Sequence, residues 1–217
     1  MKHLRPLVAA TLVAALAAPL TASFAAAQEE VAPTPLAIGS QVPLADVKMK
    51  NVDGKDVTIT SAAGKKGTLV VFTCNHCPWA KAWESRIAEL GNAAKKAGMG
   101  VIAINANDPA AYPEDNMDGM KKRAKTLKLA FPYAMDATSD IARAFGASRT
   151  PEAFLFDKSG ALVYHGTIDD NAKEPEKVTQ RYLKDAVDAV VAGTEVTTPE
   201  TKSLGCGIKY RKKTTGA

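Results

Sequence analysis

TLVVFTCNHCPW, residues 68–79, is the stretch around which the rest of the chain is interpreted. Its apolar, β-prone part, 68–72, predicts a buried strand. Apolar residues then recur every three or four positions over 79–94, which predicts an amphipathic helix. Cys74 and Cys77, in C-x-x-C spacing, lie where the strand gives way to the helix.

This position of the two cysteines has a chemical consequence. A cysteine at a helix N-terminus lies against unpaired backbone N–H groups and the positive end of the helix dipole, and both lower the thiol pKa. We expect Cys74 to attack a disulfide and Cys77 to displace the product from the mixed disulfide. His76 is expected to stabilise the Cys74 thiolate, because no other nearby residue supplies positive charge; a solvated loop histidine is the alternative.

The cysteine count is three, which is odd. In an oxidising compartment Cys74 and Cys77 can pair with each other, which leaves Cys206 over. A bridge that closes so short a loop stabilises a fold little, so the pair is interpreted as redox-active rather than structural. Cys206, flanked by glycines, is interpreted as an idle tail thiol. The alternatives are that it resolves a Cys74 intermediate or pairs with another chain.

A metal site is another interpretation of the dithiol. Zinc usually needs four ligands, and only His76, His165 and Cys206 are available, scattered along the sequence. Copper(I) accepts two thiolates, so a non-catalytic copper(I)-binding protein stays an alternative. The redox interpretation is favoured, and it requires no metal and no cofactor.

Residues 1–27 have the pattern of a cleavable secretory signal peptide. Lys2 and Arg5 form a positive start, residues 7–20 form an apolar run, and the small residues 25–27 form a cleavage site. The run is too short for a stable membrane span, which disfavours an uncleaved anchor. No cysteine follows it to accept a lipid. We therefore expect a periplasmic protein that is not embedded in the membrane.

Cleavage would leave about 190 residues, enough for one domain. We expect a linker at 28–40, a domain at 41–193 and a basic C-terminal tail at 194–217. The formal charge of +5 lies in the signal peptide and this tail, so the domain itself is neutral. A neutral domain gives no electrostatic footprint for nucleic acid. The basic tail is interpreted as a solubilising end rather than a binding segment.

Alternating and helical patterns outside the central stretch predict the remaining elements. Asp115 is expected to cap the helix that follows it. The order of elements predicts a mixed central sheet flanked by helices, and a C-x-x-C beside a βαβ pattern points to a thioredoxin-like fold. The predicted elements are an N-terminal β-hairpin (42–47 and 56–59), strands at 100–105, 131–135, 153–156 and 162–165, and helices at 117–127, 139–145 and 178–191.

Several segments together carry a resemblance to a known family. They are FTCNHCP (72–78), AINANDP (103–109), YPED (112–115), TP with FLFD (150–157), and TK with GCGIK (201–209). With these segments, residues from about 40 to 193 resemble the thioredoxin-like superfamily, particularly its exported redoxin branch with AhpC/TSA or peroxiredoxin-like domains. The resemblance implies an enzyme of redox homeostasis that exchanges disulfides with protein substrates and is recharged by a redox donor.

The resemblance also implies roles for individual residues. Cys74 would be the exposed attacking thiol and Cys77 the resolving thiol. Pro151 would be a cis-proline, and the residue before it, Thr150, would face the dithiol and pair with a substrate strand. One departure concerns Thr68, which stands where thioredoxins keep a buried acid, so no proton acceptor for Cys77 is identified.

A thiol peroxidase with antioxidant activity is the alternative that the AhpC/TSA resemblance implies. Peroxiredoxins need proline and threonine seven and three residues before their peroxidatic cysteine. If Cys77 had that role, these positions would be Val70 and Cys74, so the peroxidase triad is missing. The sequence therefore predicts a thiol–disulfide oxidoreductase first and a peroxidase second.

Overall fold

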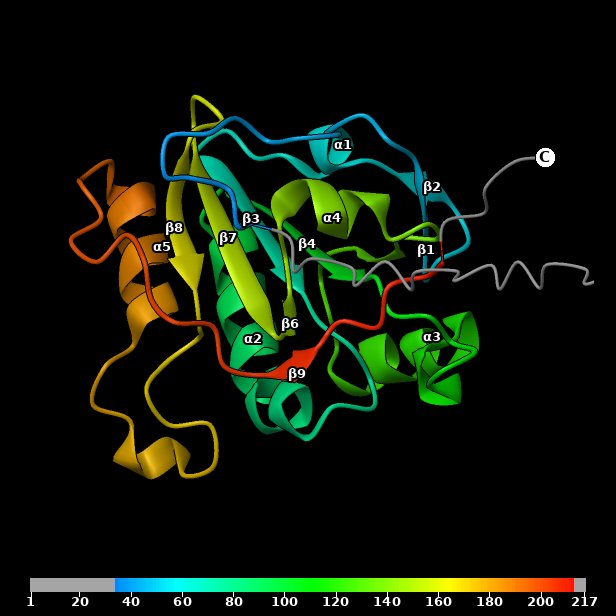
Figure 1. The fold of residues 1–217 in the computed structure, drawn as a ribbon. Coiled ribbons are helices and arrows are strands. Elements are labelled where there is room, and N and C mark those ends of the chain that lie inside the picture. Colours follow the sequence, from blue (N-terminus) through cyan, green and yellow to red (C-terminus); the bar gives the residue numbers. More distant parts are fainter. Residues whose placement is uncertain (1–33, 213–217) are drawn as a thin grey trace, which may run out of the picture. The chain divides into compact units, whose positions relative to one another are not determined.

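The computed structural model describes residues 34–212 of the 217-residue chain (Figure 1). The predicted signal peptide, the first part of the predicted linker and the last five residues of the predicted tail lie outside the described residues. Within 34–212, no helix combines the length and apolar character needed to cross a membrane.

Two sheets are formed by the strands of the described residues. These strands are β1 Met49–Asn51, β2 Asp56–Val57, β3 Gly67–Phe72, β4 Gly100–Asn105, β5 Tyr133–Met135, β6 Arg149–Thr150, β7 Glu152–Asp157, β8 Leu162–Gly166 and β9 Cys206–Gly207. The larger sheet has the order β2-β1-β5-β4-β3-β7-β8, and the smaller one pairs β6 with β9. In the larger sheet β3 is parallel to β4 and antiparallel to β7, which confirms the predicted mixed sheet.

Helices cover both faces of this sheet (Figure 1). The α-helices are α1 Ile59–Ala62, α2 Pro78–Lys96, α3 Met117–Thr126, α4 Asp140–Phe145 and α5 Tyr182–Ala192, with 3-10 turns η1 Pro113–Asp115 and η2 Pro175–Lys177. Successive residues of a strand point to opposite faces. Leu69 of β3 therefore packs into the core formed with α2 and α5, whereas Val70 packs into the core formed with α1 and α4.

The N-terminal hairpin is present, but its strands are shifted from the predicted positions. Its first strand is β1, whereas the predicted strand 42–47 contains a turn at 43–46, with Leu44 at a φ of 49°. Its second strand ends at Val57 because Thr58 caps α1 and accepts a hydrogen bond from the Ser61 N–H. The capping side chain converts the end of the predicted strand into a helix start.

The junction between β3 and α2 is as predicted. Pro78 occupies the first helical position, where its missing N–H costs no hydrogen bond, and Cys77 occupies the cap position. The helix ends at Lys96, and Gly98 follows with a φ of 94°. Both cysteines of the motif therefore lie at the N-terminal end of a five-turn helix.

The segment 199–211 returns from α5 to the body, and we call it the C-terminal strap. It is the red and orange-red segment that crosses the front of Figure 1. The Thr201 N–H donates to the His165 carbonyl at 3.0 Å, and the Ile208 N–H donates to the Ser148 carbonyl at 3.0 Å. Ile208 also packs into the core beside α1 and α4. The strap thus differs from the free basic tail expected there.

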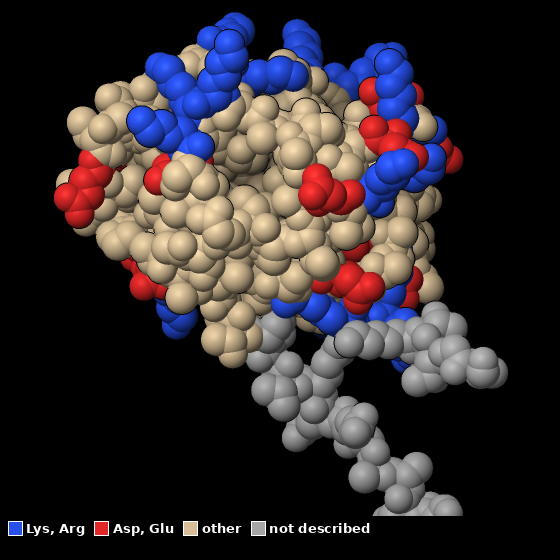
Figure 2. Space-filling model, turned by 90° about the horizontal axis from the view of Figure 1, so that it is seen from above, with Lys and Arg blue, Asp and Glu red and all other residues tan. Residues whose placement is uncertain are grey.

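Charges are distributed around the edges of the face seen in Figure 2. Lys and Arg side chains lie mainly along its rim, beside Asp and Glu side chains, and the centre is uncharged. Lys and Arg side chains gather along the upper rim of this face, and Asp and Glu side chains lie mainly toward its other edges.

Candidate functional site

All three cysteines lie together at the N-terminus of α2. A disulfide joins Cys77 to Cys206, with a Cα–Cα distance of 6.1 Å, and Cys74 is a free thiol. The three residues pack in one small cluster with Ala80. The expected Cys74–Cys77 pairing and the interpretation of Cys206 as an idle thiol are therefore wrong for this state of the protein.

Strand pairing explains how Cys206 reaches the site. β9 runs antiparallel to β6, so Cys206 lies opposite Thr150 and Gly207 lies opposite Arg149. A Cβ on Gly205 would lie 2.3 Å from the Thr150 carbonyl oxygen, so only glycine permits this approach. Of the two glycines that flank Cys206, Gly205 is therefore the one that allows the strap to pair with Thr150.

Thr150 faces both cysteines of the motif. Its peptide bond to Pro151 is cis, as the resemblance implies. The Thr150 hydroxyl oxygen lies 3.1 Å from the Cys74 sulfur, and its carbonyl oxygen lies 3.3 Å from the Cys77 sulfur. The strand that pairs with Thr150 in this structure is β9 of the same chain.

Cys74 is not the exposed thiol that was expected. Its exposed fraction is 5%. Burial raises the pKa of Cys74 to about 11; the hydrogen bond with Thr150 opposes this shift and the charge of Asp115 adds to it. The free thiol is therefore protonated at neutral pH while the strap is docked, because burial disfavours the charged form.

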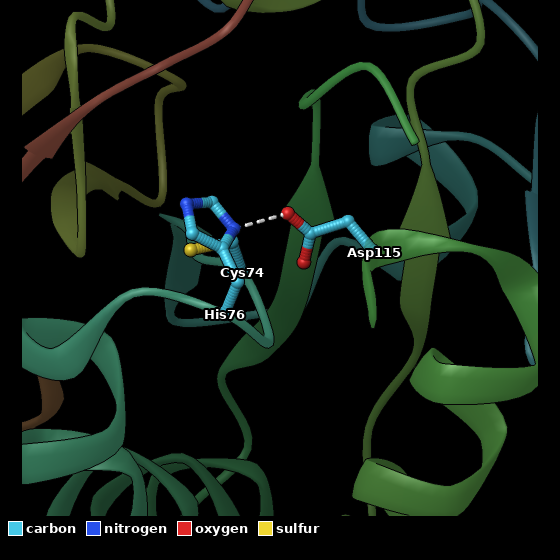
Figure 3. A group of neighbouring side chains, drawn as sticks. All are labelled: Cys74, His76 and Asp115. Atoms are coloured by element: carbon cyan, nitrogen blue, oxygen red, sulfur yellow. Dashed lines mark hydrogen bonds and ion pairs between the residues drawn. The ribbon is translucent and has the colours of Figure 1, made fainter. Parts of the chain in front are cut away.

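His76 points toward a carboxylate (Figure 3). Its Nδ1 lies 2.5 Å from Oδ2 of Asp115, and its ring stacks on Tyr112 with a centroid distance of 3.6 Å. The ligand atoms of Cys74, His76 and Asp115 all lie within 4.8 Å of one another. The structure thus brings together a nucleophile, Cys74, a base, His76, and a carboxylate that orients the base, Asp115.

Asp115 is the residue that the sequence analysis missed. Its side chain is fully buried, and its Oδ1 accepts hydrogen bonds from the Asn75 N–H at 2.6 Å and from Nδ2 of Asn105 at 3.1 Å. The expected helix cap is instead Asn116, whose side chain accepts from the Gly119 N–H. The one signal for Asp115 was its place in the YPED segment that carried the resemblance.

Asn75 holds the loop between the cysteines. Its side-chain NH₂ donates to the Glu114 carbonyl at 2.7 Å, and its side-chain oxygen accepts from the Tyr133 hydroxyl at 3.0 Å. Its own carbonyl accepts from the Arg123 guanidinium at 3.1 Å. These contacts fix the loop by bonds that do not involve the disulfide.

The donor set offers limited support for a metal. With Cys77 in a disulfide, the two thiolates that copper(I) would take are not both present. Cys74, His76 and Asp115 could contact one ion, but both oxygens of Asp115 already accept hydrogen bonds from the protein. The cluster is better suited to proton transfer than to ligation.

A small cavity adjoins Cys74. Its volume is about 30 Å³, and its wall includes Thr73, Arg123, Phe131 and Tyr133. That volume admits one or two molecules of the size of water. A protein strand cannot enter it, so a substrate disulfide would have to approach Cys74 from the side that the strap covers.

Known proteins with similar sequences are redox proteins. The chain is 26% identical over 145 residues to a chloroplastic peroxiredoxin Q of Gentiana triflora, covering 63% of this chain and 61% of that protein. It is 24% identical over 147 residues to the thiol-disulfide oxidoreductase ResA of Bacillus thuringiensis, covering 68% of this chain and 77% of that protein. The chain thus spans less than two thirds of the first relative.

Solved structures agree on the fold. A hypothetical protein of Sinorhizobium meliloti 1021 superposes with a TM-score of 0.75 at 34% identity, over 82% of this chain and 97% of that one. A thioredoxin-like protein in its oxidised form superposes with a TM-score of 0.57 at 21% identity, over 71% of this chain and 98% of that one. The predicted thioredoxin-like fold is confirmed.

The family follows from the match to a family model. The model of the AhpC/TSA family matches residues 38–165, which is more than half of the chain. The match includes the cysteine motif, Asp115 and the cis-proline, but it ends before the C-terminal strap. The chain belongs to the AhpC/TSA family.

Proposed function

We propose that the protein is a thiol–disulfide oxidoreductase that exchanges disulfides with protein substrates in the periplasm. The observation that carries the proposal is a disulfide, Cys77–Cys206, packed directly beside a third, free thiol at a helix N-terminus. Sulfur atoms in this arrangement can exchange partners without large movements of the backbone. Similarity to the thiol-disulfide oxidoreductase ResA supports the same chemistry.

The reaction is a sequence of exchanges. In the reduced protein, Cys74 gives its proton to the base His76 and its sulfur attacks a substrate disulfide, releasing one substrate thiol. Cys77 attacks the mixed disulfide, releases the second substrate thiol and leaves a Cys74–Cys77 bond. The Cys206 thiolate then attacks Cys77, forms the observed Cys77–Cys206 bond and frees Cys74. The substrate gains two electrons and the protein loses two.

The periplasmic location rests on the signal-peptide pattern of residues 1–27 and on the disulfide, which persists in oxidising compartments. N-terminal sequencing of the exported protein checks this, with a mature chain expected to begin at Gln28. A mature chain that begins at Met1 contradicts it.

Reduction of insulin disulfides by dithiothreitol tests the activity. The wild-type protein is expected to accelerate the reaction, and Cys74→Ser is expected to remove the acceleration. Asp118→Asn, a change at a side chain with 93% exposure on α3, is the matched control and should leave the rate unchanged. A wild-type rate equal to that of dithiothreitol alone rules the function out.

Thiol peroxidase activity is a second candidate, and the cavity beside Cys74 is what favours it. Its volume of about 30 Å³ admits hydrogen peroxide but no peptide. The Cys74 sulfur would attack the peroxide, giving a sulfenic acid and water, and Cys77 would condense with the sulfenic acid to form a disulfide and a second water. Peroxide consumption with a dithiol donor, in the absence of insulin reduction, would favour this candidate.

A further inference from the structure

The three sulfur-bearing residues differ in their access to solvent. Cys77 is completely buried, and Cys74 has an exposed fraction of 5%. Cys206 is partly exposed. An external thiolate must touch the sulfur that it attacks. Of the two residues in the disulfide, Cys206 is therefore the one with solvent-exposed surface.

The two sulfurs also differ as leaving groups. Cys77 is the cap residue of α2, where unpaired N–H groups and the helix dipole stabilise a thiolate. Cys206 lies in the short extended strand β9 and is not itself the cap residue of a helix. The sulfur with the lower thiol pKa leaves faster. Attack on Cys206 with departure of Cys77 is thus favoured by both access and leaving-group chemistry.

The two glycines beside Cys206 are packed differently. A Cβ on Gly207 would meet its nearest heavy atom at 4.0 Å, whereas a Cβ on Gly205 would collide with Thr150. The Arg149 guanidinium donates a hydrogen bond to the Gly205 carbonyl at 3.3 Å, directly before Cys206. A positive group at this place attracts an incoming thiolate.

We propose that Cys206 is the residue through which reducing equivalents from a dithiol donor enter the site. This inference rests on the proposed function and adds the residue at which electrons enter the protein. One donor thiolate attacks the Cys206 sulfur, the Cys77–Cys206 bond breaks, and Cys77 leaves as a thiolate and takes up a proton. The second donor thiol then attacks the mixed disulfide, which releases Cys206 as a thiol and leaves the donor oxidised to a disulfide.

Release of Cys77 also removes the disulfide, which is the only covalent cross-link between the strap and the rest of the described residues. β9 can then separate from β6, and Thr150 and Cys74 become accessible to a substrate. Reduction thus removes the cross-link that holds β9 beside Thr150 and Cys74.

Mapping of a glutathione adduct tests the entry point. The oxidised full-length protein is mixed with glutathione, quenched with acid after short times, alkylated and digested, and the peptides are identified by mass. Glutathione is expected on the Cys206 peptide in at least about tenfold excess over the Cys77 peptide, with Cys77 alkylated. Adducts mainly on Cys77 or Cys74, or a disulfide that glutathione does not open, overturn the proposal.

The variant Cys74→Ser is mapped in parallel, because it retains the disulfide but cannot exchange internally. The same excess on Cys206 is expected, and a shift of the adduct to Cys77 overturns the proposal. The insulin assay keeps the two hypotheses apart. If the protein reduces insulin but the glutathione adduct lies on Cys77, the entry point is refuted and the proposed function stands. If the protein does not reduce insulin, the proposed function itself is refuted.

Discussion

Two regions, the loop 73–77 and the C-terminal strap, meet at the three cysteines and are held in place by different contacts. The loop 73–77 is fixed by buried hydrogen bonds to Asp115, Glu114, Tyr133 and Arg123. The C-terminal strap is fixed by hydrogen bonds to the body, by packing of Ile208 into the core and by one covalent bond, Cys77–Cys206. Reduction removes that bond and leaves the loop contacts in place. The contacts of the loop are therefore independent of the redox state, whereas the strap loses one of its contacts on reduction.

Of the changes considered, removal of the disulfide should have the largest effect on the free energy of unfolding, because it releases the strap from α2 and leaves the loop contacts in place. The bond links residues 129 positions apart, and Cys206→Ser is expected to lower the free energy of unfolding of the oxidised protein by about 5 kcal/mol. Denaturant unfolding with and without reductant measures this, and the variant should match the reduced wild type. Cys74→Ser keeps the bond and is the control. Equal stability of oxidised wild type and Cys206→Ser would show that the strap is not covalently held.

Asp115→Asn tests the contacts of the loop 73–77, which do not depend on the redox state. The buried carboxylate accepts hydrogen bonds from Asn75, Asn105 and His76, and replacing it places an NH₂ group among donors. We expect a loss of about 3 kcal/mol in both redox states, because a buried charged network loses one partner. Unfolding of oxidised and reduced protein is compared with that of Asp118→Asn, whose side chain is 93% exposed. A loss confined to the oxidised protein would argue against a redox-independent loop.

Gly205→Ala tests how the strap docks. The new Cβ would lie 2.3 Å from the Thr150 carbonyl oxygen, so we expect the oxidised protein to lose about 2 kcal/mol and to contain less of the Cys77–Cys206 bond. Gly207→Ala is the matched control, since its Cβ meets nothing closer than 4.0 Å. Disulfide mapping and denaturant unfolding provide the readout. If both variants form the bond equally, close approach at Gly205 is not required.

The smallest expected effect concerns the Cys74 thiol in the oxidised protein. Its pKa is raised by burial to about 11, so its alkylation rate should rise with pH up to that value. Thr150→Val removes the opposing hydrogen bond and should raise the midpoint by about 0.5 to 1 pH unit. A midpoint below pH 8 would show that the thiol is not buried.

The same pKa shift has a consequence for stability. Above the ordinary thiol pKa of about 8.5, unfolded Cys74 loses its proton while folded Cys74 keeps it until about 11. The folded state then binds more protons than the unfolded state, so the free energy of unfolding falls as pH rises through this window. Cys74→Ser should lack this contribution.

Local sequence patterns predicted the central strands and the helix that carries the cysteine motif. The strand at 68–72, the helix that starts at Pro78 and the strand at 100–105 follow from hydrophobic periodicity, which is a property of contiguous residues. The cis bond at Pro151 followed from family resemblance rather than from the residues themselves. These features set the fold and the N-terminal position of the motif.

The pairing of Cys77 with Cys206 and the burial of Asp115 could not be predicted, each for a physical reason. Disulfide pairing depends on distance in three dimensions, and the sequence carries no distance between Cys77 and Cys206. Asp115 follows a proline-rich turn and precedes a helix, a context in which an acidic residue is normally an exposed cap. Its burial depends on Asn75 and Asn105, which come from two other segments of the chain.

The central claim is that the strap cysteine, rather than Cys74, is bonded to Cys77 in the oxidised protein. Alkylation of the native oxidised protein, followed by proteolysis without reductant and mass mapping, tests it most directly. We predict a Cys77–Cys206 linked peptide and Cys74 that is labelled at neutral pH only after unfolding, because its exposed fraction is 5%. A Cys74–Cys77 linked peptide with Cys206 free would contradict the account.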